Sequence, residues 1–188
     1  MTEWSRKRRV IRHYDRIASI YDRQYGEEQE AKINAILPHI CLNEQSLTLD
    51  VGCGTGILFP MIASKVLSAI GVDSSKKLLQ KAKQYTRRNL NTHIICADSD
   101  YLPFQNNVFN LVFAITLLQN TPNPLKTLEE MKRTSRNQAT FVVTALKKEF
   151  SEGDLRQLLK KAQLKILTMK TDEKLKDCVA ICQTQHNQ

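Results

Sequence analysis

The segment Asp50-Val51-Gly52-Cys53-Gly54-Thr55-Gly56 has the composition of a turn in which the backbone can approach a ligand closely. Glycine turns between a strand and a helix can bind dinucleotides or phosphates. The dinucleotide pattern Gly-x-Gly-x-x-Gly would need its third glycine at position 57, which is Ile57, and the phosphate-loop pattern is absent. Asp50 would repel a pyrophosphate but would stabilise an ammonium group. The spacing therefore argues against both usual ligands.

Two further acids follow the next two segments that have the character of strands. Asp73 comes about 21 residues after Gly52, the spacing at which a carboxylate binds ribose hydroxyls in nucleotide-binding units. Asp98 follows the third predicted strand, where its side chain can accept a hydrogen bond from the exocyclic amine of a base. Any one of these acids could equally be a helix cap or a loop residue. Their presence at consecutive strand ends predicts a pocket for an adenosyl group.

The pattern of apolar residues predicts an α/β fold around this pocket. Residues 3–40 predict two helices, divided at Gly26 and ending near Pro38. From residue 46 onward strands alternate with helices; the predicted strands are 46–51, 69–72, 93–97, 109–115, 140–146, 164–171 and 177–183, and the predicted helices are 57–65, 75–90, 124–135 and 151–162. Such alternation predicts a mostly parallel sheet with helices on both faces, and ligands beyond the carboxyl ends of its strands.

The last two predicted strands are joined by the short polar segment 172–176, which predicts an antiparallel hairpin. No linker or repeat divides the chain. We therefore expect a single domain over 1–188, in which an N-terminal helical cap, 1–40, precedes a catalytic α/β core, 46–183.

Several of these segments together resemble the motifs of a known family. Residues 49–56 resemble the first motif of the class I S-adenosylmethionine (SAM)-dependent methyltransferases, and Gly71-Val72-Asp73-Ser74-Ser75 resembles their second motif. Ala97-Asp98 with Leu102-Pro103-Phe104 is similar to their acidic loop, and 109–113 resembles their fourth strand, although Asn110 replaces the usual aspartate. The similarity extends from about residue 10 to 183 and points to the UbiE/COQ5-like, or methyltransferase type 11, group. It implies a Rossmann-like sheet of seven strands with the last strand antiparallel.

The resemblance implies that SAM is the cofactor and that residues at four strand ends bind it. These residues are Asp50, Gly52, Cys53, Gly54 and Gly56 in the glycine loop, Asp73 and Ser74 after the second strand, Asp98 and Ser99 after the third, and Thr116 and Leu117 after the fourth. By this resemblance the glycine loop and Asp50 hold the methionine end, Asp73 the ribose, and Asp98 with Ser99 the adenine. Tyr14 and Tyr21, seven residues apart on one predicted helix face, could cover the pocket or could simply pack an amphipathic helix.

The sequence says less about the methyl acceptor than about the cofactor. Residues 116–124 lie where a substrate should arrive, but they include no His, Asp, Glu or Cys that could act as a base. Gln119, Asn120 and Tyr21 are candidates for orienting the substrate. Residues 120–122 lack the aromatic residue of the Asn/Asp-Pro-Pro-Tyr motif of nitrogen methyltransferases, and the His often found near position 119 in related members is absent. Short connections between strands favour a macromolecular acceptor or an activating partner subunit, whereas the family most often modifies small molecules.

Composition limits the function further. The 188 residues carry a formal net charge of +9, with basic clusters at 6–16 and 76–88 that could bind nucleic acid or simply be solvated helix faces. Five scattered cysteines, without zinc spacing, predict free thiols, no metal site and a reducing, cytoplasmic compartment. The sequence has no apolar segment typical of a membrane span or a secretory signal.

Three functions therefore stay open. The first is a SAM-dependent methyltransferase that acts on an unidentified acceptor, with a small molecule favoured. The second is an RNA (tRNA) methyltransferase that uses the basic clusters. The third is a non-catalytic SAM-binding partner subunit, against which the glycine triplet and Asp73 count, because a degenerate partner would be free to lose them.

Overall fold

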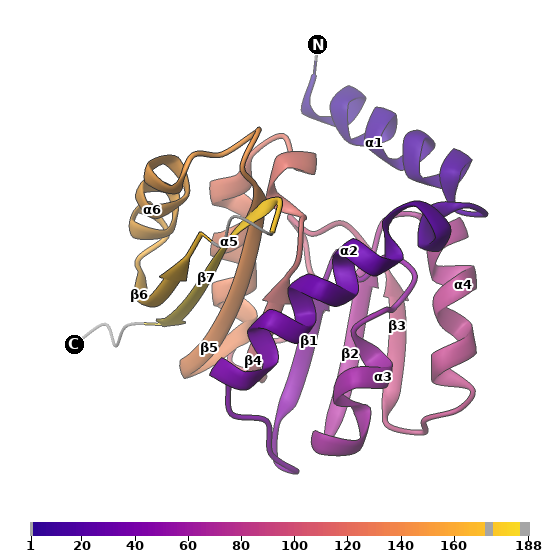
Figure 1. Cartoon of the computed structure of the whole chain (residues 1–188), viewed down its shortest axis with the longest axis horizontal. Helices are drawn as coiled ribbons and strands as arrows, with labels where there is room; N and C mark the ends of the chain where they lie inside the picture. The colour runs from indigo at the N-terminus through magenta and orange to yellow at the C-terminus, as the bar shows by residue number, and fades with distance from the viewer. Residues whose placement is uncertain (1, 172–174, 185–188) are drawn as a thin grey trace.

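The computed structural model describes residues 2–171 and 175–184, in which seven strands form one twisted sheet with helices on both faces (Figure 1). The strands are β1 (Leu47–Val51), β2 (Ser68–Asp73), β3 (Thr92–Cys96), β4 (Phe109–Ala114), β5 (Ser135–Leu146), β6 (Leu164–Lys170) and β7 (Asp177–Thr184). Their order across the sheet is β3-β2-β1-β4-β5-β7-β6. Strands β1 to β5 are parallel, and β7 is antiparallel to both of its neighbours. The sheet reverses its order between β1 and β4, so a crevice for ligands is expected at the carboxyl ends of these strands.

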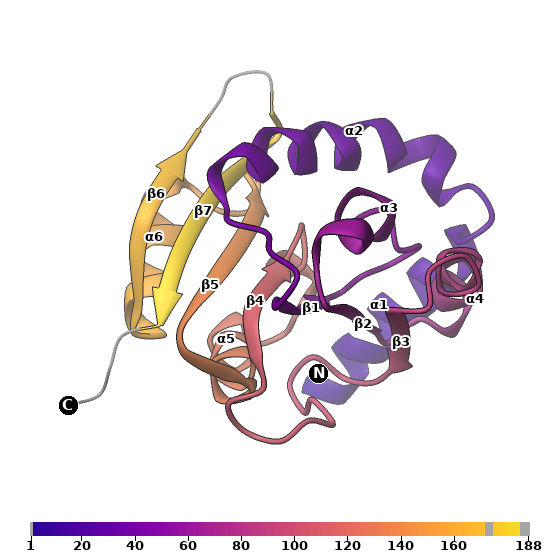
Figure 2. The ribbon, with the colours of Figure 1, turned by 90° about the horizontal axis from the view of Figure 1, so that it is seen from below.

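The helices divide between the faces of the sheet and its carboxyl edge. They are α1 (Glu3–Ile17), α2 (Tyr21–Ile36), α3 (Phe59–Ile62), α4 (Lys76–Thr86), α5 (Pro124–Thr134) and α6 (Glu152–Lys161), with short 3₁₀ turns η1 (Leu37–His39), η2 (Ala63–Lys65) and η3 (Leu118–Asn120). Figure 2 shows α2 and α3 on one face and α5 and α6 on the other. Helix α1 lies beyond the carboxyl ends of the parallel strands, next to α4 (Figure 1). No helix in the described ranges has both the length and the apolar character that a membrane crossing requires.

Alternating side chains of the central strands build two cores, one under each helical layer. In β4, Leu111 and Phe113 pack with α2 and α3, whereas Val112 and Ala114 pack on the side of α5 and α6. This follows from the period of two residues in a strand. All four side chains are buried, which explains why the strand reads as a continuous apolar run.

Capping side chains define where three of the helices begin. Ser75 accepts a hydrogen bond from the backbone at the start of α4, and Asn123 does the same for α5, whose first residue is proline. Ser151 and Asp154 form a reciprocal capping box at the start of α6. The predicted start of this last helix, with its acids, is confirmed.

The α/β fold, the parallel sheet and the terminal hairpin are confirmed, although part of the connecting segment 172–176 lies outside the described residues. Several element ends differ from the prediction. The predicted helix 57–65 is split into α3 and η2, α4 ends at Thr86, and β5 begins five residues earlier than expected, at Ser135.

The predicted boundary between the two N-terminal helices is wrong. The chain leaves α1 at Ile17 and enters α2 at Tyr21, so Gly26 lies inside α2. A glycine within a helix costs only about 1 kcal/mol relative to alanine, which packing can outweigh. In consequence Tyr14 and Tyr21 lie on two different helices, not on one helical face.

Gly71 of β2 offers a test of the packing between the sheet and α3. A Cβ at this position would lie 2.7 Å from both Cys53 Sγ and Phe59 Cζ. We expect Gly71→Ala to lower the free energy of unfolding by about 1–3 kcal/mol in urea denaturation, because buried neighbours would have to move.

Gly26→Ala is the matched control, because its Cβ would meet only Asp22 Cβ, at 3.9 Å. This change should raise the free energy of unfolding by roughly 0.5–1 kcal/mol, as it removes a helix-interior glycine. Destabilisation of the same size in both variants would contradict this account of Gly71.

Candidate functional site

A cavity of about 280 Å³ opens at the carboxyl ends of β1 to β4, beneath α1. The strand ends contribute Gly52, Gly54, Asp73, Ser74, Asp98, Ser99, Thr116, Leu117 and Asn120 to its lining, and the N-terminal helices contribute Trp4, Lys7, Ile11, Tyr14 and Tyr21. Most of the residues predicted to bind a cofactor thus surround one space. Asp50 and Cys53 instead line a smaller hollow of about 30 Å³, together with Gln29 and Ile33 of α2. Gly56 lines neither of these two spaces.

The glycine loop is shaped by backbone conformations that favour glycine. Gly52 has a φ of +77°, and a Cβ there would lie 2.8 Å from Leu117 Cδ1. Gly56 has a φ of +80°, and its Cβ would lie 2.8 Å from Phe59 Cδ2, so this glycine permits packing of the loop on α3. The Cys53 thiol beside them is buried, and burial raises its pKa well above the ordinary value. This thiol therefore stays protonated and is not a nucleophile.

Asp73 connects the glycine loop to the start of α4. Its carboxylate accepts hydrogen bonds from the backbone N–H of Gly54, at 2.9 Å, and of Ser75, at 2.7 Å. Burial raises its pKa, although these backbone donors act in the opposite direction. The backbone of Ser74 is a third donor to this carboxylate, and since a carboxylate has about four acceptor positions, it can still accept a hydrogen bond from a ligand in the cavity.

Asp50, at the end of β1, is almost fully buried, with a relative exposure of 4%. Burial and the negative charge of Asp73 raise its pKa to about 7. The carboxyl group is therefore poised to change its charge near neutral pH, one residue from the end of β1 and next to the glycine loop.

Lys7 is the site residue that the sequence analysis missed. Its ammonium group bonds both oxygens of Asp98, at 2.8 and 2.7 Å, and forms an ion pair with Asp100. Burial alone would lower the pKa of Lys7, but its hydrogen bonds with the two aspartates outweigh this effect and raise the pKa. Cavity-lining residues recur at helical spacing in α1, at Trp4, Lys7, Ile11 and Tyr14. This pattern is the sequence signal that could have identified Lys7 as a site residue.

Tyr14 and Tyr21 meet over the cavity although they come from different helices. Their rings are 6.1 Å apart in an edge-to-face arrangement. Burial raises the pKa of both phenols, and a hydrogen bond with Asn120 partly offsets the effect at Tyr14. Both hydroxyls therefore stay protonated at neutral pH and can act as hydrogen-bond donors.

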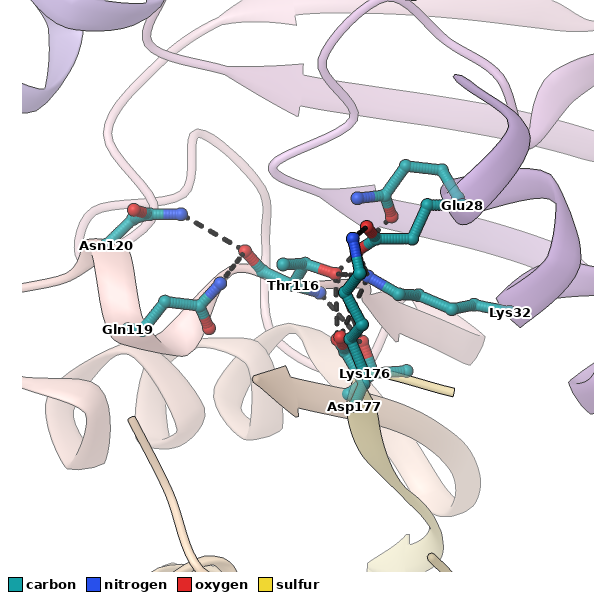
Figure 3. Close-up of polar contacts among 9 residues, drawn as sticks. Glu28, Lys32, Thr116, Gln119, Asn120, Lys176 and Asp177 are labelled. Carbon is teal, nitrogen blue, oxygen red and sulfur yellow. Dashed lines mark hydrogen bonds and ion pairs between the residues drawn. The ribbon is translucent and has the colours of Figure 1, made fainter. Parts of the chain in front are cut away.

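The two substrate-orienting candidates that follow β4 occupy different places (Figure 3). Asn120 lines the cavity, and its amide donates to the carbonyl oxygen of Thr116 at 3.1 Å. Gln119 does not line the cavity; its amide donates to the same carbonyl at 2.7 Å. The third candidate, Tyr21, lines the cavity.

Comparison with known proteins gives this cavity a context. Residues 49–143, which include the glycine loop, Asp73, Asp98 and Thr116, match the family described as "Methyltransferase domain". The chain belongs to this family. The resemblance inferred from the motifs is thereby confirmed at the level of the family, and the match runs from within β1 to within β5.

Two curated relatives of this methyltransferase domain carry names of enzymes. A malonyl-[acyl-carrier protein] O-methyltransferase from Marinomonas sp. (strain MWYL1) is 28% identical over 158 residues, which cover 83% of this chain and 57% of the relative. A demethylmenaquinone methyltransferase from Staphylococcus haemolyticus is 30% identical over 137 residues, which cover 69% of this chain and 57% of the relative. The chain thus spans a little over half the length of these two relatives.

Solved structures share the fold. A SAM-dependent methyltransferase from Aquifex aeolicus superposes with a TM-score of 0.71 at 21% identity and covers 80% of this chain and 88% of its own. A putative methyltransferase in complex with the Trm112 methyltransferase activator of Haloferax volcanii gives a TM-score of 0.78 at 18% identity, covering 92% and 98%. These similarities confirm the seven-stranded sheet with its antiparallel last strand.

The raised pKa of Asp50 predicts a pH dependence of stability. The ordinary pKa is 3.8 and the pKa in the fold is about 7, so between these values the folded state binds more protons than the unfolded state. The free energy of unfolding should therefore decrease as the pH rises from about 4 to about 7, by at most roughly 1.4 kcal/mol per pH unit from this group.

Urea denaturation across this pH range, with wild type and Asp50→Asn, measures the effect. The Asp50→Asn variant should lose this part of the slope. Asp154→Asn is the control, because the bond with Ser151 lowers the pKa of exposed Asp154, so this group does not cause stability to decrease as the pH rises. A slope that is the same in wild type and Asp50→Asn would exclude the raised pKa.

Proposed function

We propose that the chain transfers the methyl group of SAM to an acceptor, with SAM bound in the cavity beneath α1. The observation that carries the proposal is the meeting of Gly52, Asp73 and Asp98, from three strand ends, around one cavity in a methyltransferase-family fold. When bound, SAM supplies the electrophilic methyl group. The work of the chain is then to hold the nucleophile in line with that group.

The residues present suit the parts of SAM. Asp73 keeps an acceptor position for a ribose hydroxyl beside its three backbone donors. Asp98 and Ser99 lie where the adenine would be placed, and there Asp98 would share its carboxylate with Lys7. The methionine end would lie along the glycine loop near Gly52 and Gly54, where ionised Asp50 would attract its ammonium group. Tyr14, Thr116 and Leu117 would close over the cofactor.

The polar groups near the acceptor side orient a substrate better than they remove its proton. Asn120 and the protonated hydroxyls of Tyr14 and Tyr21 are donors, and burial raises the pKa of both phenols. An acceptor whose attacking atom has no proton to lose therefore fits this site, since it needs no general base. A small molecule of this kind is the favoured acceptor, and a cytoplasmic location remains our prediction. The Haloferax structure, which contains an activator, supports a partner subunit as an open alternative.

Calorimetric titration with SAM tests the cofactor site. Wild type should bind, and Asp73→Ala should weaken binding by more than ~1 kcal/mol, which is about fivefold or more, because the ribose bond is lost. Asp73→Asn should retain part of the affinity, since it keeps one acceptor oxygen. Asp154→Asn, an exposed acid in the first turn of α6, is the control and should bind as wild type does. Unchanged affinity in Asp73→Ala would remove this residue from the site.

Methyl transfer itself is tested with SAM labelled by tritium in the methyl group. The protein is incubated with fractionated cell extract, and the label is followed into small molecules, RNA, protein and lipid. We expect incorporation into a small-molecule fraction. Binding of SAM without transfer to any fraction would instead support the non-catalytic subunit.

A second candidate, an RNA acceptor, is favoured by aromatic and basic side chains at the mouth of the cavity. Trp4 lines the cavity and is 57% exposed, with the Arg8 guanidinium 5.8 Å from its ring centre. Tyr101 is 66% exposed, with Lys126 at 4.0 Å. Exposed rings beside cations are typical of surfaces that bind single-stranded nucleic acid. The exposed side of α1 extends the positive charge with the further basic residues Arg9, Arg12 and Arg16.

This candidate predicts tRNA binding that weakens steeply as the salt concentration rises. The triple variant Arg8→Gln, Arg12→Gln, Arg16→Gln should reduce binding at least tenfold in a filter-binding assay, because phosphate contacts are lost. The control replaces three lysines of α6 and β6 by glutamine, Lys160, Lys161 and Lys165, which lowers the net charge by the same amount as the triple arginine variant. Binding that is absent, or that does not respond to salt, would exclude an RNA acceptor.

A further inference from the structure

Lys32 of α2 is a lysine with no exposed surface. Its ammonium group donates hydrogen bonds to Glu28 Oε1 at 2.8 Å and to Thr116 Oγ1 at 3.1 Å, and it forms an ion pair with Asp177 Oδ1 at 2.8 Å (Figure 3). The buried charge of Lys32 is therefore compensated by two carboxylates as well as by two hydrogen bonds. A fifth residue, Lys176, contacts Glu28 Oε2 at 2.6 Å, and the cluster therefore contains two cations and two carboxylates. The charges are balanced although they come from α2 and from the start of β7.

This cluster surrounds Thr116, whose backbone conformation is unusual. Thr116 is β-branched, yet it has a φ of +56°, in the left-handed region. A conformation of this kind persists only where the surroundings hold it. The Thr116 hydroxyl contacts Asp177 Oδ2 at 2.9 Å as well as Lys32, and the Thr116 N–H donates to Thr144 Oγ1 at 2.9 Å. The Thr144 hydroxyl in turn donates to Asp177 Oδ2 at 2.8 Å.

The backbone of Thr116 sets one wall of the cavity. Leu117 packs so closely on the glycine loop that a Cβ at Gly52 would lie 2.8 Å from its Cδ1. The carbonyl oxygen of Thr116 accepts from the amides of Gln119 and Asn120, and Asn120 lines the cavity and bonds Tyr14. A rotation of Thr116 out of the left-handed region would move this whole wall.

We propose that Lys32 and Asp177 are positioning residues, which hold Thr116 in its left-handed conformation and thereby place Leu117 and Asn120 at the SAM cavity. Neither the Lys32 nor the Asp177 side chain lines the cavity, so the effect of these residues on the cavity passes through Thr116. This inference rests on the proposed function, because the cavity it concerns is the SAM site.

The energetics of buried charge support a positioning role. Replacement of a buried ion pair by apolar residues of similar volume is often neutral or even stabilising, because desolvation offsets the attraction between the charges. Stability alone therefore gives little reason for a buried lysine at this place. Burial opposes ionisation of Glu28, yet the hydrogen bonds from Lys176 and Lys32 outweigh it and lower its pKa. The Glu28 carboxylate consequently stays ionised at neutral pH and holds the Lys32 ammonium beside Thr116.

The test replaces Lys32 and Asp177 by apolar side chains, and then changes residue 116 so that it can keep its positive φ without them. The variant Lys32→Met, Asp177→Leu lacks the contacts to Thr116. In a second variant, Thr116→Gly is added to these two changes, because glycine adopts a positive φ without support from a side chain. We expect the first variant to stay folded and to bind SAM at least tenfold more weakly by calorimetry, and the second to recover part of that affinity. Thr116→Gly alone should cost less affinity than the pair variant.

Hydrogen exchange of the backbone amides of 117–121 gives a readout that does not depend on SAM. Two of these amides are bonded within the turn, from Asn120 to Leu117 and from Thr121 to Leu118. Their protection should fall in the pair variant and should be regained when Thr116→Gly is added. If wild type does not bind SAM, the proposed function fails, while the exchange data still decide whether the pair positions the turn.

The control removes an exposed ion pair, Glu152–Arg156 of α6, by Glu152→Gln with Arg156→Gln, and should leave both readouts unchanged. Should the apolar pair variant not fold, Asp177→Asn with and without Thr116→Gly gives the same comparison, since it weakens the contacts and keeps an acceptor for the Thr116 hydroxyl. Unchanged protection, or a loss of affinity that Thr116→Gly does not relieve, would overturn the inference, because the pair would then only join α2 to β7.

Discussion

The carboxylate of Asp73 is the contact on which the cofactor side of the cavity depends. One of its oxygens holds the N–H of Gly54, and the other holds that of Ser75, the residue that caps α4. The glycine loop and the start of a helix are thus fixed to the end of β2 by a single side chain. The same charge helps to raise the pKa of Asp50. Asp73 therefore affects both the position of the glycine loop and the pKa of the neighbouring Asp50.

The roof of the cavity is attached in another way. Each residue of α1 is described, and each keeps part of its surface exposed. Polar contacts hold the helix to the core: Lys7 with Asp98, and Asp15 with Ser75. No side chain of α1 is fully buried, and elements of this kind open locally at a smaller cost in free energy than the core does. Access of a ligand to the cavity then requires no change in the sheet.

The acceptor side depends on buried charges from distant parts of the chain. Lys32 and Asp177 are far apart in sequence, and they meet because α2 crosses the sheet face next to the start of β7. Their contacts to Thr116 set the turn that carries Asn120. The two sides of the cavity thus combine a local motif with a tertiary cluster, which suits a family that keeps its cofactor while its acceptors differ, as the names of the two relatives show.

The local pattern of residues alone determined the strands, the glycine loop and the acids at the strand ends, because strand periodicity, turn chemistry and loop spacing act over a few residues. It also determined that these acids would meet, since parallel strands end at one edge of a sheet. Tertiary structure decided the boundary between α1 and α2, where Gly26 misled the prediction because a helix tolerates one glycine when packing compensates. It likewise decided the partners of Lys7 and Lys32. Charged residues look alike in sequence, and only the packing of helices on the sheet brings their opposite charges within bonding distance.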